Sequence, residues 1–205
     1  MSDQVTPILL VLAGPAGSGK STLCDRLVHE DPTFTRVVTT TSRPPRPGEI
    51  NGIHYHFFKP EEFEQRIAAG EFLEWAQVHG KNRNRLYGTL ASSVLEPLKA
   101  GRNLIMSVDV QGVESFRRAA RINPLIARNM KTVFIVVDHE RLVARMRDRA
   151  QDNEAEIAGR MKTAERELRE AHKFDYKIPS ASKEADYAKL LAIIDQARGN
   201  LAGGE

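Results

Sequence analysis

Two hydrophobic patterns alternate along most of the chain: short continuous apolar runs, and longer polar segments in which apolar residues recur every three or four positions. The short runs predict buried β-strands, at residues 8–13, 104–109, 132–138 and 176–178. The helical spacing is clearest in two stripes, Ile157, Met161, Ala164, Leu168 and Ala171, and Leu190, Ile193, Ile194, Ala197 and Leu201. Apolar strands that alternate with helices predict an α/β fold, with a parallel sheet sandwiched by helices.

Residues 38–89 interrupt this alternation. They contain a turn rich in proline, arginine and glycine, SRPPRPGEING at 42–52, and then the alternating aromatic segment HYHFF at 54–58. Such segments are typical of turns and of short strands. We expect them to form short antiparallel strands in a mixed α/β subdomain inserted into the core. One domain over 1–205 is therefore predicted, with a core made of residues 5–37, 90–139 and 166–205.

A second interruption, at residues 140–165, is rich in arginine and contains RDRAQDNEAE at 147–156. Its arginines are Arg141, Arg145, Arg147, Arg149 and Arg160. The segment is too polar for the core, so we expect a mobile helical lid over a site. The alternative is a solvated helix face, which is what charged runs usually form.

The first apolar run leads into the glycine-rich turn GPAGSGKS at 14–21, and a helix is expected to start near Lys20. This is the complete G-x-x-x-x-G-K-[ST] pattern of a phosphate-binding loop, in the strand–loop–helix context that the pattern requires. Glycines let the backbone amides face an anion, and the helix adds its positive end. Lys20 can reach β- and γ-phosphates, and the Ser21 hydroxyl can bind Mg²⁺.

Composition and charge exclude fewer classes of protein than the phosphate-loop motif does. A chain of 205 residues with a net charge of +3 suits a globular protein with an anionic ligand, and basic runs with interleaved aromatic residues, typical of nucleic-acid binding, are absent. The single cysteine, Cys24, excludes an internal disulfide and is expected in the core. The N-terminal apolar run is too short for a signal sequence or a membrane span, so a cytoplasmic location without membrane contact is expected.

A phosphate loop, a small polar insertion and an arginine-rich lid together favour phosphoryl transfer between two substrates. One substrate is a triphosphate on the loop, and the other is an acceptor held by the insertion. This reaction depends on in-line positioning and charge neutralisation rather than on a covalent nucleophile. A closing lid keeps water away from the γ-phosphate.

Six motifs, in this order, resemble those of guanylate kinases: GPAGSGKSTL (14–23), TTSRPPRPGEINGIHY (40–55), EFLEWAQVHG (71–80), LYGT (86–89), VDVQGV (108–113) and RMRDRAQDNEAEIAGRM (145–161). The second motif, with its R-x-x-R-x-G-E-x-x-G-x-x-Y arrangement, is highly specific. The resemblance implies transfer of the γ-phosphate of ATP to GMP, with Mg²⁺ as cofactor. It places ATP on Gly14, Pro15, Ala16, Gly17, Ser18, Gly19, Lys20, Ser21 and Thr22, and Mg²⁺ on Ser21.

The resemblance places GMP on Thr39, Arg43, Arg46, Glu49, Tyr55, Glu74, Tyr87, Thr89 and Asp109. The chemistry of several of these residues fits that role. Arg43 and Arg46 can fork onto the acceptor phosphate, to which Tyr55 and Tyr87 can donate hydroxyl hydrogen bonds. A carboxylate at Glu74 can accept from guanine N1–H and the 2-amino group, whereas adenine would leave it unpaired.

The residues implied to act on the transferring phosphoryl group are Lys20, Arg43, Arg145, Arg149 and Arg160. The chain also departs from the family pattern: Ser107 stands where an aspartate is usual, Thr39 replaces serine, and Ala150 replaces glycine. The loop 80–88 carries extra residues, and PSAS at 179–182 lacks the usual adenine-contacting Asn-Asp pair. These differences leave donor-base selectivity and the surroundings of the metal open.

Two alternatives remain at this point. One is a non-catalytic domain of guanylate kinase type that binds a partner peptide, although such domains usually lose the phosphate loop that Lys20 and Ser21 complete here. The other is a kinase for a different phosphorylated acceptor, against which Glu74 and the Arg43/Arg46 pair argue. The sequence does not predict the oligomeric state.

Overall fold

The computed structural model describes residues 6–78, 85–148 and 154–202. Arg149, Ala150 and most of the loop 80–88 lie outside these ranges, as does the side chain of Arg145.

The core is a five-stranded parallel sheet in the order β2-β7-β1-β8-β9. Its strands are β1 (Leu9–Ala13), β2 (Phe34–Arg36), β7 (Asn103–Ser107), β8 (Met130–Val136) and β9 (Tyr176–Pro179). The four strands predicted from apolar runs are therefore present, within two residues of the expected bounds. The edge strand β2 was not predicted, because it is short and includes the polar residues Thr35 and Arg36.

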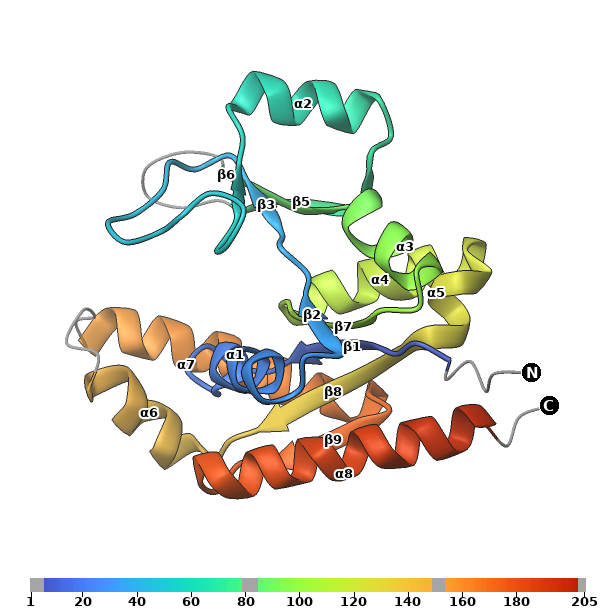
Figure 1. Cartoon of the computed structure of the whole chain (residues 1–205). Helices are drawn as coiled ribbons and strands as arrows, with labels where there is room; N and C mark the ends of the chain where they lie inside the picture. The colour runs from blue at the N-terminus through green and yellow to red at the C-terminus, as the bar shows by residue number, and fades with distance from the viewer. Residues whose placement is uncertain (1–5, 79–84, 149–153, 203–205) are drawn as a thin grey trace.

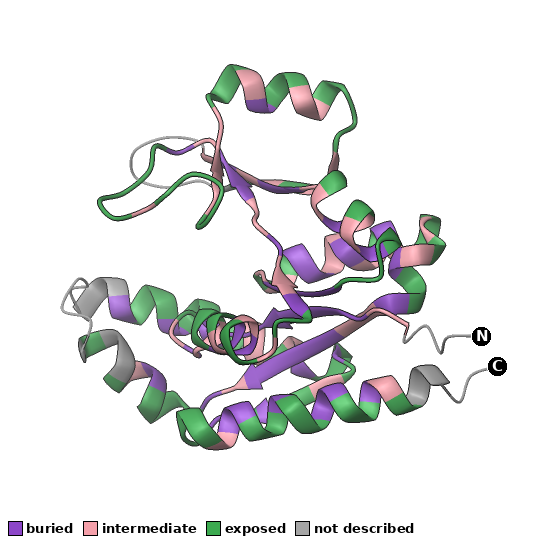
Figure 2. Ribbon diagram, in the orientation of Figure 1, coloured by how far each residue is buried: buried purple, intermediate pink, exposed green. Residues whose placement is uncertain are grey.

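Helices cover both faces of this sheet, as the alternation predicts (Figure 1). On one face lie α1 (Lys20–Glu30), α6 (His139–Asp148), α7 (Glu154–Arg169) and α8 (Lys183–Ala202); on the other lie α3 (Ser92–Lys99), α4 (Val110–Ile122) and α5 (Pro124–Asn129). Strand β1 serves both layers: Leu10 and Leu12 belong to the first core cluster, whereas Leu9 and Val11 belong to the second. All residues of β1 are buried, and the buried residues lie along the centre of the molecule in Figure 2.

A second, four-stranded sheet stands apart from the core sheet, with α2 (Pro60–Ala68) beyond it (Figure 1). Its order is β4-β3-β6-β5, made of β3 (Thr40–Thr41), β4 (His56–Phe57), β5 (Phe72–Val78) and β6 (Arg85–Leu90). The expectation of antiparallel strands is wrong for one pair, because β3 and β4 run parallel, with Thr40 opposite His56. The long loop between them returns the chain to the same end, which a tight hairpin cannot do.

Two further boundaries differ from the predicted ones. The apolar stripe expected over 154–172 belongs to α7 and then to a 3-10 helix, η1 (Glu170–Lys173). Strand β7 ends at Ser107, so Asp109 lies on the loop after it and caps α4 by accepting a hydrogen bond from the backbone N–H of Gly112, at 2.7 Å. Among the described residues, no helix is both long and apolar enough to cross a membrane.

Candidate active site

The phosphate loop follows β1 at the carboxyl edge of the core sheet, where parallel sheets place their ligands. Gly14 approaches β8 so closely that a Cβ on it would lie 2.7 Å from the carbonyl oxygen of Ile135. Gly19, with φ at 96°, starts α1 in the left-handed region that glycine enters without strain. Both glycines are thus required by backbone geometry.

Lys20 folds back over this loop. Its ammonium donates to the carbonyl oxygens of Gly14, at 2.6 Å, and Pro15, at 3.0 Å. The Ser18 hydroxyl is buried and has no hydrogen-bond partner among the described residues. Ser21 is exposed at the start of α1. The loop therefore presents a lysine, a hydroxyl and a helix N-terminus together, which is the combination that binds nucleotide phosphates.

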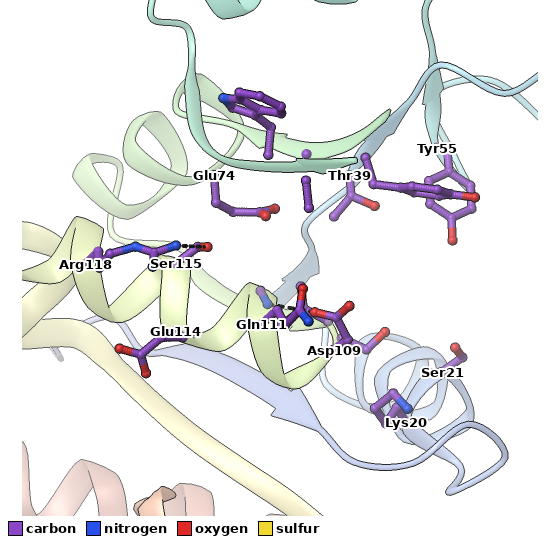
Figure 3. A pocket seen from close by; sticks show the side chains of 17 residues that line it. Lys20, Ser21, Thr39, Tyr55, Glu74, Asp109, Gln111, Glu114, Ser115 and Arg118 are labelled. Carbon is purple, nitrogen blue, oxygen red and sulfur yellow. Dashed lines mark hydrogen bonds between the residues drawn. The ribbon is translucent and has the colours of Figure 1, made fainter. Parts of the chain in front are cut away.

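A cleft of about 760 Å³ runs from this loop to the small sheet (Figure 3). Seven of the predicted residues line it, namely Lys20, Ser21, Thr39, Tyr55, Glu74, Tyr87 and Asp109. Thr39, Tyr55 and Glu74 face it from the small-sheet side, whereas Lys20, Ser21 and Asp109 face it from the core. The fold therefore brings the predicted donor and acceptor residues to opposite walls of one cleft.

Glu74 is the half-buried carboxylate of the acceptor wall. Its Oε1 atom accepts a hydrogen bond from the Thr89 hydroxyl, at 2.7 Å, across the β5–β6 pair. Burial raises the pKa of Glu74, the Thr89 hydrogen bond lowers it, and the charge of Asp109 raises it further. Thr89 thus orients the carboxylate, which leaves Oε2 for a ligand's N–H groups.

Arg43 is buried, and both of its terminal nitrogens donate to Glu49, at 2.5 and 2.7 Å. The Arg43 guanidinium holds the pKa of Glu49 at about 2, helped by the backbone N–H of Arg46. The Arg43 guanidinium also lies over the Tyr55 ring, 5.1 Å from its centre, and its Nε has no partner among the described residues. The predicted fork is thus engaged by Glu49, and Arg43 also contacts Tyr55 and Tyr87, the two tyrosines that line the cleft.

Other predicted residues do not line this cleft. Arg46 is exposed; its backbone N–H donates to the Glu49 carboxylate at 2.7 Å, and its carbonyl oxygen accepts from the backbone N–H of Glu49 at 3.0 Å. Arg160 is exposed on α7, and Arg149 lies outside the described residues. Cys24 is buried as expected, and burial raises the pKa of its thiol to about 12, with Ser107 as a hydrogen-bond partner. The serine that replaces a carboxylate at position 107 therefore also contacts the core.

The PSAS segment, which begins with the last residue of β9, is held by hydrogen bonds to α8 and α6. The Ser180 hydroxyl donates to Asp186 at 2.7 Å, and Ser182 accepts from the backbone N–H of Ala185 at 3.1 Å. Arg141 of α6 donates to the Ser180 and Ala181 carbonyls, at 2.9 and 3.1 Å. The start of α6 is thereby tied to the segment expected to meet the donor base.

The structure adds cleft residues that sequence reasoning did not single out. Gln111, Ser115 and Arg118 line the cleft from one face of α4, and Arg118 donates to the Ser115 hydroxyl at 2.7 Å. Gln111 stands inside the VDVQGV motif, which was a usable signal, whereas Arg118 resembles any surface arginine in sequence. Glu167 of α7 also acts electrostatically on this region, because its charge interacts with those of Lys20 and Asp109.

A phosphate loop at the edge of a parallel sheet, facing a small second sheet across one cleft, defines a phosphate-loop kinase of the nucleoside monophosphate kinase class. The model of the family described as guanylate kinase matches residues 6–197. The chain therefore belongs to the guanylate kinase family, and it is an enzyme of that class.

Individual relatives agree with the family match. A guanylate kinase from Idiomarina loihiensis is 40% identical over 189 residues, which cover 91% of this chain and 85% of that protein. One from Nitratidesulfovibrio vulgaris is 38% identical over 192 residues, covering 94% of this chain and 88% of that protein. The crystal structure of guanylate kinase from Anaplasma phagocytophilum shares the fold, with a TM-score of 0.72 at 24% identity over 95% of this chain and 87% of that one.

Proposed function

We propose that this enzyme transfers the γ-phosphoryl group of ATP to GMP, and to dGMP, in one direct in-line step. An oxygen of the GMP phosphate forms a bond to the γ-phosphorus as the bond to the β–γ bridging oxygen breaks, and ADP leaves. The observation that carries the proposal is the position of Glu74, a hydrogen-bonded carboxylate in the same cleft as Lys20 and Ser21.

On the donor side, residues 14–22 hold the triphosphate, and Lys20 moves from the Gly14 and Pro15 carbonyls to the β- and γ-phosphates. The exposed Ser21 hydroxyl in the same cleft is a hard oxygen ligand, which fits Mg²⁺. When bound, Mg²⁺ neutralises phosphate charge and fixes phosphate geometry. Arg145, Arg149 and Arg160 close over the transferring group from the lid segment 140–165.

On the acceptor side, Glu74 accepts hydrogen bonds from guanine N1–H and the 2-amino group. Tyr55, Tyr87 and Arg46 bind the GMP phosphate. Arg43 completes this set if the phosphate competes with Glu49 for its terminal nitrogens or engages its Nε, which has no partner in the described part of the chain. Thr39 and Asp109, which line the cleft, complete the surroundings of the nucleotide.

A coupled assay with ATP, Mg²⁺ and a panel of nucleoside monophosphates tests the proposal. GMP and dGMP should be phosphorylated, and AMP, CMP and UMP should be poor acceptors, because their bases leave the Glu74 carboxylate unpaired. Turnover of another acceptor in preference to GMP would contradict the guanine assignment. Binding of a phosphopeptide without any nucleotide turnover would favour the interaction-domain alternative.

The division into core, insertion 38–89 and lid 140–165 remains a proposal, as does the cytoplasmic location. Limited proteolysis with and without nucleotides tests the division, since cleavage should concentrate in the lid and be suppressed by ligands.

A further inference from the structure

Helix α4 lines the cleft with a stripe of polar side chains. Gln111, Ser115 and Arg118 follow one another at spacings of four and three residues, which places them on one face of the helix. The opposite face carries Val113 and Phe116, which are fully buried in the core. The packing of this apolar face therefore holds the polar stripe at the cleft.

The stripe lies close to the strand that carries Glu74. Helix α4 packs against β5, and Leu73 of that strand packs against the core cluster that includes the buried face of α4. Glu74 is the next residue of the strand, and it lines the same cleft as Ser115 and Arg118. In Figure 3 the Ser115–Arg118 pair lies on one side of Glu74, and Thr39 lies on the other. The cleft thus continues past the Glu74 carboxylate onto α4.

Ser115 and Arg118 present hydrogen-bond donors to this part of the cleft. A terminal nitrogen of Arg118 donates to the Ser115 hydroxyl oxygen at 2.7 Å. This bond uses the acceptor side of the hydroxyl and leaves its hydrogen to donate. The exposed Arg118 guanidinium has five N–H groups and no acceptor atom, so it can only donate. The carboxylate of Glu114, which also lines the cleft, is paired with Arg117 at 3.3 Å.

This donor pair matches a part of guanine that Glu74 does not bind. In the proposed complex, Glu74 accepts from guanine N1–H and from the 2-amino group. The positions that flank these two groups are O6, next to N1, and N3, next to the carbon that carries the 2-amino group. Both are acceptors, so a side chain beside Glu74 that also contacts the base edge must donate. Ser115 and Arg118 meet that requirement.

A purely structural role explains the pair less well. Serine is a weaker helix former than alanine, and a contact between side chains three positions apart adds little to the stability of a helix. The neighbouring Arg117 has the structural contacts, because it binds the Glu114 carboxylate and the carbonyl oxygen of Lys173. Arg118 instead lines the cleft.

We propose that Ser115 and Arg118 are specificity-determining residues of the acceptor site: together they donate hydrogen bonds to a guanine acceptor, O6 or N3, beside the groups that Glu74 binds. The inference rests on the proposed function, and it extends base recognition from the small sheet to a helix of the core. The pair acts on binding of the base, because the groups that act on the transferred phosphate belong to the phosphate loop and the lid.

The test compares steady-state kinetics, and GMP affinity by calorimetry, for the wild type, Arg118→Met and Arg121→Met. Arg121 is the matched control, because it is exposed on the same helix and does not line the cleft. Arg118→Met should raise the KM for GMP and weaken GMP binding roughly five- to thirtyfold, because a charge-assisted hydrogen bond to the base is lost. Its kcat should be nearly unchanged, since the lost contact is made in the ground state and the transition state alike. Arg121→Met should match the wild type.

Two further variants test the pair as a unit. Ser115→Ala should weaken GMP binding roughly two- to fivefold, because a neutral hydrogen bond is lost. The effects of Ser115→Ala and Arg118→Met should not add in the double variant, since each disrupts the same pair. Arg118→Lys, which keeps the charge and a donor, should recover part of the loss.

Base analogues identify the acceptor. In 6-thio-GMP a sulfur atom, which is a weaker acceptor, replaces O6, and in 3-deaza-GMP a C–H group replaces N3. The wild type should bind the analogue that lacks the recognised acceptor severalfold more weakly than GMP, whereas Arg118→Met should bind that analogue and GMP equally. Dependence on O6 means that the pair also rejects adenine, whose 6-amino group is a donor. Dependence on N3 means that the pair selects purines over pyrimidines.

The inference is overturned if Arg118→Met and Arg121→Met have the same KM and the same affinity for GMP, or if neither analogue distinguishes the wild type from Arg118→Met. A lower kcat with an unchanged KM also overturns it, because a base contact acts on binding. If Arg118→Met does not fold, Ser115→Ala is measured with the same analogues and judged by the same criteria. A wild type that does not phosphorylate GMP would instead contradict the proposed function.

Discussion

At the scale of single residues, the acceptor wall depends on pairs of side chains rather than on isolated groups. Glu74 is oriented by Thr89, and Arg43 is engaged by Glu49. All four residues are expected to meet GMP, and in the structure each of them is hydrogen-bonded to the other member of its pair. A substitution in one of these pairs should therefore change GMP binding without changing the stability of the fold only where the other residue of the pair keeps its hydrogen bond.

Glu74→Gln should reduce kcat/KM for GMP by roughly 30- to 4000-fold, the equivalent of about 2–5 kcal/mol. Glutamine presents an NH₂ donor to a guanine donor, and a charge-assisted hydrogen bond is lost. The melting temperature without ligand should change little, because the glutamine carbonyl oxygen still accepts from Thr89. GMP kinetics within threefold of wild type would show that Glu74 does not recognise the base.

Glu49→Gln should make the protein less sensitive to acid. The folded pKa of Glu49, about 2, lies below its ordinary value of 4.5. Its ion pair with Arg43 therefore stabilises the fold fully above that ordinary value, and the contribution is lost as the pH falls toward 2. Thermal melts between pH 7 and pH 2 should show a smaller loss of stability over this window for the variant. Parallel curves for the two proteins would contradict the assignment.

At the scale of elements, α6 and α7 connect the donor site to the rest of the enzyme. The start of α6 is bound to the PSAS segment by Arg141, and the middle of α7 packs in the core through Met161 and Ala164. Helix α6 is thus held at its start and α7 along its middle, and the two helices pack against each other (Figure 1).

Amide hydrogen exchange in the C-terminal half of α6 and the N-terminal half of α7 should slow when ADP and GMP are both bound. The arginines of these helices gain phosphate partners, so the closed arrangement becomes more populated. Helix α8 provides an internal control, since it packs away from the cleft and should not change. Unchanged protection in α6 and α7 would favour a solvated helix face without a lid function.

At the scale of the whole molecule, the cleft lies between two sheets that share part of their packing, because Leu73 of β5 packs against the core cluster that contains Leu9 and Val11 of β1. Ligands that contact both walls should therefore stabilise the folded chain as a unit. The stabilisation follows from mass action, because a ligand that binds only the folded state shifts the unfolding equilibrium.

GMP at a hundred times its dissociation constant should stabilise the protein by about 2.7 kcal/mol, and thus raise the melting temperature by roughly 5–10 °C for a chain of this size. AMP at the same concentration should have a much smaller effect, because its base cannot pair with Glu74. A thermal-shift measurement with both nucleotides checks this prediction. Equal shifts would mean that the cleft binds monophosphates without selecting the base.

Local patterns determined a large part of this protein. The apolar runs predicted four of the five core strands, because a strand buried on both faces must be apolar throughout. The phosphate loop was predictable because each requirement of its backbone, including the close approach at Gly14, is met by a specific residue type within eight positions. The insertion was predictable because residues 38–89 interrupt the alternation of apolar strands and helices, and its function was predicted from the family motifs that it contains.

Only the tertiary structure decided the rest. The β3–β4 pair is parallel because of the path of a long loop, and β2 joins the sheet through β7, so neither follows from local pattern. Arg43 is bound by Glu49, and Glu74 is bound by Thr89. The charge of Glu167 interacts with that of Lys20, which is 147 positions away in the sequence. The sequence specifies which chemical groups are present, whereas their partners, and hence their charge and orientation, depend on which distant elements the fold packs together.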